Sequence, residues 1–293
     1  MIEKFLDYLR YERNRSALTV TTYERSLRDF EFFFKNRDSQ LSWESVDSDV
    51  IRDWMESMMD RGDMATSVNR CLSAVRSFFR FALSRKLVEK DPSHVVKGPK
   101  KQKPLPHFVR ENEMDRLIDT KEIWGSDYKD VRARAIIILF YSTGIRLAEL
   151  IGLDDRDVDF GARQLKVTGK RNKQRVIPFG DEVETVLRDY VSLRNQIVGQ
   201  PTTALFVSEK GQRISRSSVR SLVNKYLSMV TTMRKRSPHV LRHTFATAML
   251  NNGAGLESVR KLLGHESVAT TEIYTHTTFE QLKKVYKEAH PRA

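Results

Sequence analysis

A segment rich in proline and lysine limits how this chain can fold more than any other feature. Residues 96–106 read V-K-G-P-K-K-Q-K-P-L-P, with three prolines and four lysines in eleven positions. Proline lacks the amide hydrogen that helices and central strands need, so the segment can be neither. It predicts a basic domain linker over residues 91–107, between domains at residues 1–90 and 108–293. Three of its lysines are either solvated or lie along phosphates: Lys100, Lys101 and Lys103.

The first domain is expected to be helical throughout. Apolar residues recur at helical spacing in residues 1–90 and predict four helices. Their methionine and aromatic stripes are typical of a core and not of a cofactor site. The fourth helix also carries Arg70, Arg76 and Arg80 away from its apolar stripe. That face is either simply solvated or a surface for the DNA backbone.

The second domain is expected to be mostly helical with one β-hairpin, which makes the whole fold mainly α with a small β-hairpin or sheet (α+β). Residues 164–168 and 174–179 alternate as paired strands do, and residues 169–173 join them. The hairpin tip and a later helix over residues 215–230 are basic. Both are interpreted as possible DNA contacts, against the alternative of ordinary exposed charges, through Lys170, Arg171, Lys173, Arg216 and Arg220.

The charge balance favours a polyanionic partner. Lys and Arg number 51 against 38 Asp and Glu, giving a net charge of +13, which indicates nucleic acid before membrane. The single cysteine, Cys71, lies in a helical pattern and excludes a disulfide framework. The sequence holds no zinc-type Cys/His cluster, no phosphate-binding glycine loop, no signal-peptide pattern and no apolar run of membrane-spanning length. We therefore expect a cytoplasmic protein without metal, cofactor or membrane contact.

The region from residue 237 to residue 274 groups residues suited to phosphate chemistry. A serine–proline pair at 237–238 predicts the start of a helix, on which His239 and Arg242 share one face. His265 follows a glycine at the end of a short apolar helix, and Tyr274 comes nine residues later. A guanidinium fork suits phosphate oxygens, and a tyrosine hydroxyl can form a covalent intermediate. The group suggests a phosphate that is held and attacked.

Several motifs together resemble the tyrosine recombinase (phage integrase) family, and within it the Xer type of site-specific recombinase. Each motif alone is weak, but five in the family's order are specific. They are T-G-I-R-L-A-E-L at 143–150, G-K-R-N-K-Q-R at 169–175, H-V-L-R-H-T-F-A-T at 239–247, L-L-G-H at 262–265 and I-Y-T-H at 273–276. With the helical first domain and the ending K-E-A-H-P-R-A at 287–293, the resemblance covers nearly the whole chain. The resemblance implies a SAM-like helical core-binding domain followed by the family's catalytic domain.

The resemblance assigns phosphate binding to three residues. Arg146 and Arg242 would hold the non-bridging oxygens of the scissile phosphate, and His265 would donate a hydrogen bond to it. This assignment agrees with the chemistry of the reaction. The transition state is a phosphorane that carries extra negative charge, and guanidinium groups held in place stabilise that charge.

It assigns bond making and proton transfer to three more. Tyr274 would attack and leave a 3′-phosphotyrosyl bond, His239 would accept or relay its proton, and Lys170 would protonate the leaving 5′ oxygen. Lys173 on the same turn competes with Lys170 for that role. The phosphotyrosine conserves the energy of the broken bond, so no ATP or metal is required. Two further tyrosines fall inside helices and are interpreted as packing residues: Tyr141 and Tyr226.

The resemblance also implies how the protein assembles. Four protomers, of this chain alone or with a related recombinase, would act on double-stranded DNA at a dif-like site and resolve chromosome dimers, under a DNA-translocase regulator. A last helix over residues 278–288 would dock on a neighbouring protomer or on its own domain through Phe279, Leu282 and Tyr286. The alternatives are an integrase of a mobile element, a type IB topoisomerase, and a DNA-binding protein without catalysis.

Overall fold

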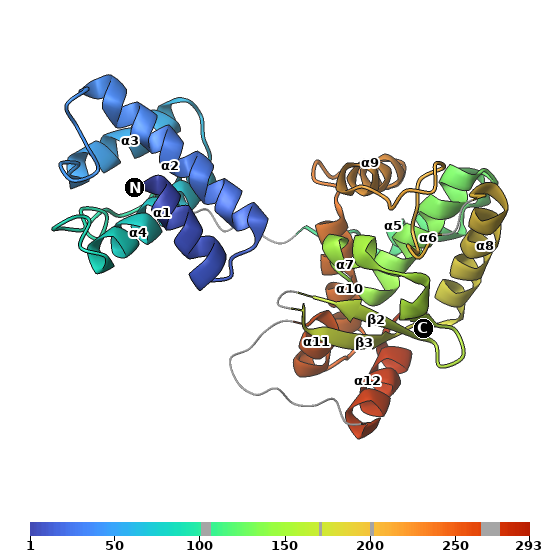
Figure 1. Ribbon diagram of the computed structural model, residues 1–293. Helices are drawn as coiled ribbons and strands as arrows, with labels where there is room; N and C mark the ends of the chain where they lie inside the picture. Colours follow the sequence, from blue (N-terminus) through green and yellow to red (C-terminus); the bar gives the residue numbers. More distant parts are fainter. Residues whose placement is uncertain (101–106, 170–171, 200–201, 265–275) are drawn as a thin grey trace. The chain divides into compact units, whose positions relative to one another are not determined.

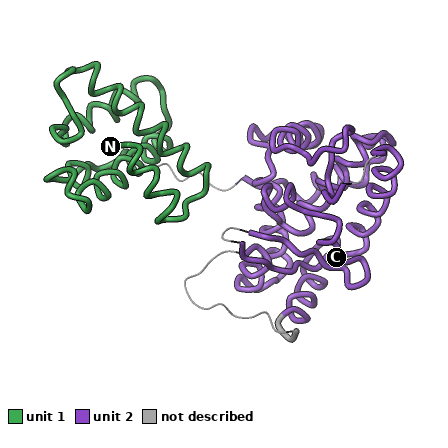
Figure 2. Tube along the Cα trace, viewed as in Figure 1, with its two compact units in different colours: residues 1–104 green, residues 105–293 purple. Residues whose placement is uncertain are grey.

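The chain folds into two compact units, Met1–Pro104 and Leu105–Ala293 (Figure 2). They are seen in a computed structural model that describes residues 1–100, 107–169, 172–199, 202–264 and 276–293. The fold is mainly α with one small sheet, as the sequence predicts (Figure 1). Within the described ranges, no helix is both long and apolar enough to cross a membrane.

Unit 1 is a bundle of helices around an aromatic core. Its segments are α1 (Ile2–Asp7), a π-helical turn (Tyr8–Glu12), α2 (Ala17–Arg37), α3 (Ser48–Asp60) and α4 (Ala65–Ser84). Ser16 caps α2 by accepting from the backbone of Thr19, and Asp47 caps α3 in the same way. The loop residue Trp43 stacks into the centre of the bundle, with its ring centroid 4.3 Å from that of Phe78. The methionine and aromatic stripes are therefore core, as predicted.

The segment after α4 packs on unit 1 for much of its length. The Arg76 guanidinium donates to the carbonyls of Ser93 and Val96, and Val96 is fully buried. The Asn69 amide donates to the carbonyl of Pro99 at 2.8 Å. Residues 93–99 are therefore held against α4, although the sequence predicts a linker beginning at residue 91. The composition of this segment does not reveal that side chains of α4 donate hydrogen bonds to its carbonyls.

Unit 2 surrounds one buried helix with others and with a small sheet. The first helices are α5 (Glu111–Asp119), α6 (Tyr128–Thr143) and α7 (Leu147–Gly152). The later ones are α8 (Asp181–Ile197), α9 (Arg216–Leu227), α10 (Pro238–Asn251), α11 (Leu256–Leu263) and α12 (His276–Ala289). Short 3-10 turns cover Lys121–Ile123 and Asp155–Asp157. Helix α6 packs against α8 and α10, and its apolar run from Ala135 to Phe140 is fully buried.

The sheet is antiparallel, in the order β1 (Val158–Asp159), β2 (Gln164–Thr168) and β3 (Gln174–Pro178). Strands β2 and β3 form the predicted hairpin, with Gln164 opposite Pro178 and Thr168 opposite Gln174. The Gly169 amide donates to the Lys173 carbonyl at 2.7 Å and closes the tip. Because side chains alternate between faces, Arg175 and Ile177 both point into the domain, where both are buried.

The last helix docks on its own domain, one of the two sites that the sequence left open. Leu282 and Tyr286 of α12 are buried in the core of unit 2, where α12 packs against β3, α10 and α11 (Figure 1). Arg292 fixes the tail beyond it by donating to Asp115, Asp119 and Glu182. A short helix that is marginal alone is stabilised by this apolar contact.

Candidate active site

Helix α10 places two of the candidate residues side by side. Ser237 occupies the N-cap position and Pro238 the first helical position, as predicted, although the Ser237 hydroxyl makes no capping bond within the described residues. His239 and Arg242, three positions apart, then share a face. His239 is accessible to solvent, whereas only 8% of Arg242 is exposed.

Buried Arg242 is fixed by two backbone carbonyls from distant parts of the chain. Its Nη1 donates to Gly144 at 2.6 Å and its Nη2 to Leu263 at 2.7 Å. Gly144 ends α6 in the left-handed conformation (φ +60°), where glycine is favoured. A β-carbon there would lie 2.4 Å from Cδ1 of Phe245. Glycine is therefore required for the close approach that aims this carbonyl at Arg242.

Arg146 lies at the start of α7, beside Arg242. Its Nη1 donates to Glu149 Oε1 at 2.8 Å, and its Nη2 donates to the Gly264 carbonyl at 2.9 Å. The Arg146 amide also donates to Glu149 Oε2 at 2.7 Å, which caps the helix. The guanidinium remains partly exposed. Arg146 is thus held by three hydrogen bonds and is still partly open to solvent.

A third arginine, which sequence reasoning did not single out, completes the cluster. Arg175 of β3 donates from Nη1 and Nη2 to the two oxygens of Glu149, at 2.8 and 2.9 Å. Its Nε donates to the Leu262 carbonyl at 2.9 Å. Both side chains are buried. The available signals were the three-residue spacing of Arg146 and Glu149 and the inward register of Arg175 in an alternating strand.

The three arginines bind three consecutive carbonyls at the end of α11. Arg175, Arg242 and Arg146 donate to residues 262, 263 and 264 respectively. The last carbonyls of a helix lack partners within the helix and carry its negative dipole end, so they favour cations. Helix α11 ends at Gly264, which has φ +63° and leaves room for the Arg175 side chain.

The cluster carries more positive charge than its own carboxylate balances. Burial raises the pKa of Glu149, but its bonds with Arg175 and Arg146 outweigh this and lower the pKa to about 2. Burial, followed by the charges of Arg146 and Arg175, lowers the pKa of Arg242 to about 9. Three guanidinium groups thus lie around one ionised carboxylate in a partly buried site. An anion bound here would remove the excess repulsion.

His239 is suited to accept a proton. Partial burial of the ring lowers its pKa, and neighbouring positive charges lower it further. Those charges come from His243, Arg242, Arg220 and Lys235. A lowered pKa keeps the imidazole neutral near pH 7, which is the form that can act as a base.

Three predicted catalytic residues, Lys170, His265 and Tyr274, lie outside the described residues. The described chain ends directly beside two of them, at Gly169 in the hairpin and at Gly264 after α11. Both glycines lie against the Glu149–Arg175 pair, since a β-carbon on Gly169 would lie 3.3 Å from Glu149 Oε1. Lys173, the competing lysine, is exposed near the hairpin tip.

The two alternative tyrosines are packing residues, as interpreted from the sequence. Tyr141 is fully buried in α6, and burial raises its pKa. Burial and then the hydrogen bond to Asp130 raise the pKa of Tyr226, whose ring stacks on Trp124. Neither hydroxyl is placed to ionise and attack a phosphate.

The predicted DNA-contact residues fall into three groups. Six of them have exposed side chains on α4, on the segment after it, on the hairpin or on α9. They are Arg70, Arg80, Lys100, Lys173, Arg216 and Arg220. Arg76 differs, because its guanidinium is used to hold the segment after α4. Outside the described residues are Lys101, Lys103 and Arg171.

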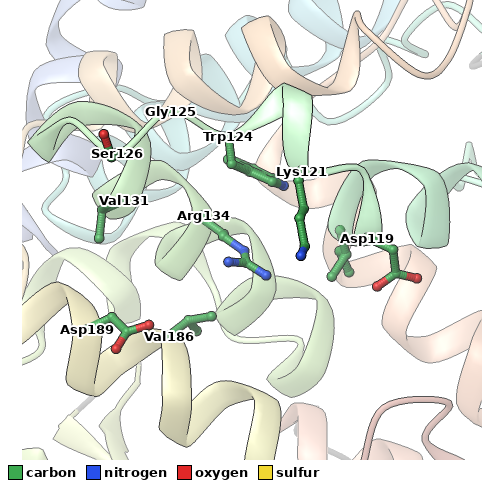
Figure 3. Close-up of a pocket in the computed structure, with 10 residues that line it drawn as sticks. Asp119, Lys121, Trp124, Gly125, Ser126, Val131, Arg134, Val186 and Asp189 are labelled. Carbon is green, nitrogen blue, oxygen red and sulfur yellow. The ribbon is translucent and has the colours of Figure 1, made fainter.

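A separate pocket of about 470 Å³ lies between the 3-10 turn after α5 and the helices α6 and α8 (Figure 3). Lys121 and Arg134 point into it, with Trp124 beside them. It shares no residue with the arginine cluster. In the described parts of the chain, no group of three or more His, Cys, Asp or Glu side chains could hold a metal ion.

Comparison with known proteins gives matches over both units. Residues 107–281 match the model of the phage integrase family, and residues 2–86 match its N-terminal SAM-like domain. The tyrosine recombinase XerC of Chlorobaculum tepidum is 38% identical over 99% of this chain and 94% of its own length. The tyrosine recombinase XerD of Staphylococcus epidermidis is 35% identical over 100% and 99%.

Solved structures share the fold at lower identity. The site-specific recombinase XerH bound to a difH substrate has a TM-score of 0.71 at 22% identity, covering 97% of this chain and 83% of that one. The Tn1549 transposon integrase in complex with transposon right end DNA has a TM-score of 0.73 at 20% identity, covering 98% of each chain. These matches give no support to the type IB topoisomerase alternative.

Proposed function

We propose a cleavage mechanism on the premise that this chain belongs to the phage integrase family: it is a tyrosine recombinase, a DNA strand-exchange enzyme. The observation that carries the mechanism is the arginine cluster, in which Arg146 and Arg242 are held rigidly beside an excess of positive charge. The scissile phosphate binds there, and the two guanidinium groups stabilise the charge that grows on its non-bridging oxygens. His265 donates a further hydrogen bond to the phosphate.

Tyr274 is the nucleophile. Its hydroxyl oxygen attacks phosphorus to form a 3′-phosphotyrosyl bond, while the bond from phosphorus to the 5′ oxygen breaks. His239 takes the tyrosine proton, since a tyrosine with a pKa of about 10 does not ionise readily at pH 7. Lys170 gives a proton to the leaving 5′ oxygen. Rejoining runs these steps in reverse with the 5′ hydroxyl of the partner strand, so no nucleotide cofactor or metal is consumed.

The biological role that we propose is strand exchange at a dif-like site, which resolves chromosome dimers during segregation in the cytoplasm. The full-length similarity to proteins named XerC and XerD supports this reading, as does a fold neighbour bound to a difH substrate. Four protomers, of this chain alone or with a related recombinase, hold two duplexes and exchange one strand pair at a time. A DNA translocase is the proposed regulator.

A suicide substrate tests the chemistry. A duplex carrying a candidate dif-like site, nicked next to the cleavage point, loses a short fragment after attack and so traps the covalent adduct. The wild-type protein and Tyr11→Phe, whose tyrosine is 76% exposed in unit 1, should both form the adduct on a denaturing gel. Tyr274→Phe should form none. An adduct that persists in Tyr274→Phe would refute the assignment of the nucleophile.

A second substrate tests the biological role. A plasmid with two directly repeated dif-like sites should be resolved into two circles by the wild-type protein, with a related recombinase added where needed. The alternative is an integrase of a mobile element. It would be favoured if the protein formed the covalent adduct on the suicide duplex but did not resolve this plasmid, and exchanged strands only at the ends of a mobile element.

A further inference from the structure

We propose that Arg175 is a positioning residue that holds the β2–β3 hairpin, whose connection contains the predicted acid Lys170, against α7 and the end of α11. The inference deepens the proposed function and rests on it. It assigns a role to a buried side chain outside the set that the motifs imply.

The contacts of Arg175 join three elements of the candidate site. Its two Nη atoms bind Glu149, which also holds Arg146, and its Nε binds the carbonyl of Leu262. It thereby connects β3 to α7 and to the end of α11. In the described structure these are the elements that carry or border Arg146, Lys170 and His265.

The packing around Arg175 places its guanidinium between two glycines. A β-carbon on Gly264 would lie 3.0 Å from Nη1 of Arg175, and one on Gly169 would lie 3.9 Å from the same atom. Gly169 directly precedes Lys170, and Gly264 directly precedes His265. The side chain therefore packs beside the two backbone positions that directly precede the predicted catalytic residues.

A hairpin needs such an anchor if a lysine near its tip is to act as an acid. Among the described residues of the tip, the Gly169 amide donates to the Lys173 carbonyl, and Asn172 has a positive φ of +59°. A bidentate arginine–carboxylate pair is planar and directional, so it fixes orientation as well as distance. Arg175 supplies this constraint five residues after Lys170, from within the regular strand.

Glu149 does not depend on Arg175 alone to hold Arg146. The Arg146 amide and its Nη1 each bind one oxygen of Glu149, and its Nη2 binds Gly264. Arg175→Lys keeps a positive charge beside Glu149 but loses the fork and its fixed angle. This substitution should therefore disturb the position of the hairpin more than it weakens phosphate binding.

The test compares two leaving groups in single-turnover cleavage of the suicide duplex. One duplex has the normal 5′ oxygen at the cleavage point, and the other has sulfur in that bridging position. A thiolate is a far better leaving group than an alkoxide and departs without an acid. We expect Arg175→Lys to slow cleavage of the oxygen duplex by about 10²-fold, the scale of a misplaced catalytic group. Cleavage of the sulfur duplex should slow by less than about tenfold, as it should in Lys170→Ala, which removes the acid itself.

Arg194→Gln is the matched control for loss of a buried arginine. Arg194 is 3% exposed, forms a bidentate pair with Asp155 and binds the carbonyls of Ala204 and Leu205, and none of these partners belongs to the arginine cluster. Its substitution should lower thermal stability and leave the ratio of the two cleavage rates unchanged.

The outcomes separate this inference from the proposed function. Equal slowing of both duplexes by Arg175→Lys, or no slowing of either, overturns the positioning role while the recombinase mechanism stands. Absence of adduct from wild-type protein on both duplexes overturns the mechanism, and this inference with it.

Discussion

At the residue scale, the end of one short helix explains how three arginines share a small site. Like charges repel, and each guanidinium loses hydration on burial. The carbonyls of residues 262 to 264 offset both costs, because each accepts a hydrogen bond and together they form the negative end of α11. Glu149 neutralises only part of the remaining charge. The site is therefore arranged as a receptor for an anion before any DNA arrives.

Replacing Gly144 by alanine should damage this receptor through the backbone. A β-carbon in the left-handed conformation costs about 1 to 2 kcal/mol, and overpacking against Phe245 adds about 1 to 3 kcal/mol. The carbonyl that binds Arg242 would also move. We expect lower stability in urea unfolding and weaker adduct formation. Gly152→Ala is the control, because nothing lies within 4 Å of its β-carbon position, and its stability should be unchanged or slightly higher.

Cleavage should respond to pH through His239. Its folded pKa is lowered, so the neutral form that accepts the tyrosine proton persists to a lower pH than for an ordinary histidine. The cleavage rate should therefore stay level as pH falls through about 6.5 and decline only below it. Lys235→Gln removes one of the positive charges that lower the pKa, so it should move this decline to higher pH. An unchanged profile in both His239→Ala and Lys235→Gln would contradict the assignment of His239 as base.

The same scale shows why motif reasoning found only part of the site. Arg146, His239 and Arg242 follow from short patterns, and in the structure Arg146 and Arg242 bind neighbouring carbonyls at the end of α11. Arg175 and Glu149 form a buried ion pair between residues 26 positions apart in the sequence. A single sequence does not state which strand meets which helix, so a buried ion pair of this kind becomes visible only in the folded chain.

At the element scale, arginines on α4 divide into structural and exposed ones. Arg76 binds the carbonyls of Ser93 and Val96, whereas Arg70 and Arg80 are exposed. Arg76→Gln should speed amide hydrogen exchange over residues 93–99, because it removes the donor that holds this segment. Arg70→Gln should leave that exchange unchanged and instead reduce the salt dependence of DNA affinity, by about one unit of slope for a lost phosphate contact. If only Arg76→Gln reduced the salt dependence of DNA affinity, Arg76 would be the phosphate contact and Arg70 would not.

Local patterns predicted the elements well and their docking less well. The predicted strand at 164–168 matches β2, because periodicity and turn residues act over a few positions. The attachment of residues 93–99 to α4 depends on side chains some 20 to 30 positions away. The docking of α12 likewise depends on a surface made by β3, α10 and α11. The boundary between the units, after Pro104, falls inside the predicted linker, but proline content alone does not show that the first part of this linker packs on α4.

At the scale of the whole molecule, each unit has a hydrophobic core of its own. Trp54, Phe78 and Phe79 are buried in the core of unit 1, while Ile137, Phe206 and Phe245 belong to that of unit 2. A domain with its own core can fold alone. The fragment 1–104 and the fragment 105–293 should therefore each unfold cooperatively in urea, followed by circular dichroism.

The covalent connection should then matter for DNA binding more than for folding. If both units contact the same duplex, attachment turns the second contact into an intramolecular event, which raises affinity by about 10²- to 10⁴-fold over separate modules. An equimolar mixture of the two fragments should bind the site more weakly than the intact chain by this factor, at one fixed salt concentration. Each fragment measured alone sets the baseline. If one fragment bound as tightly as the intact chain, that unit would carry the affinity by itself, and the exposed arginines of α4 or of α9 would have to be reassigned as solvated charge.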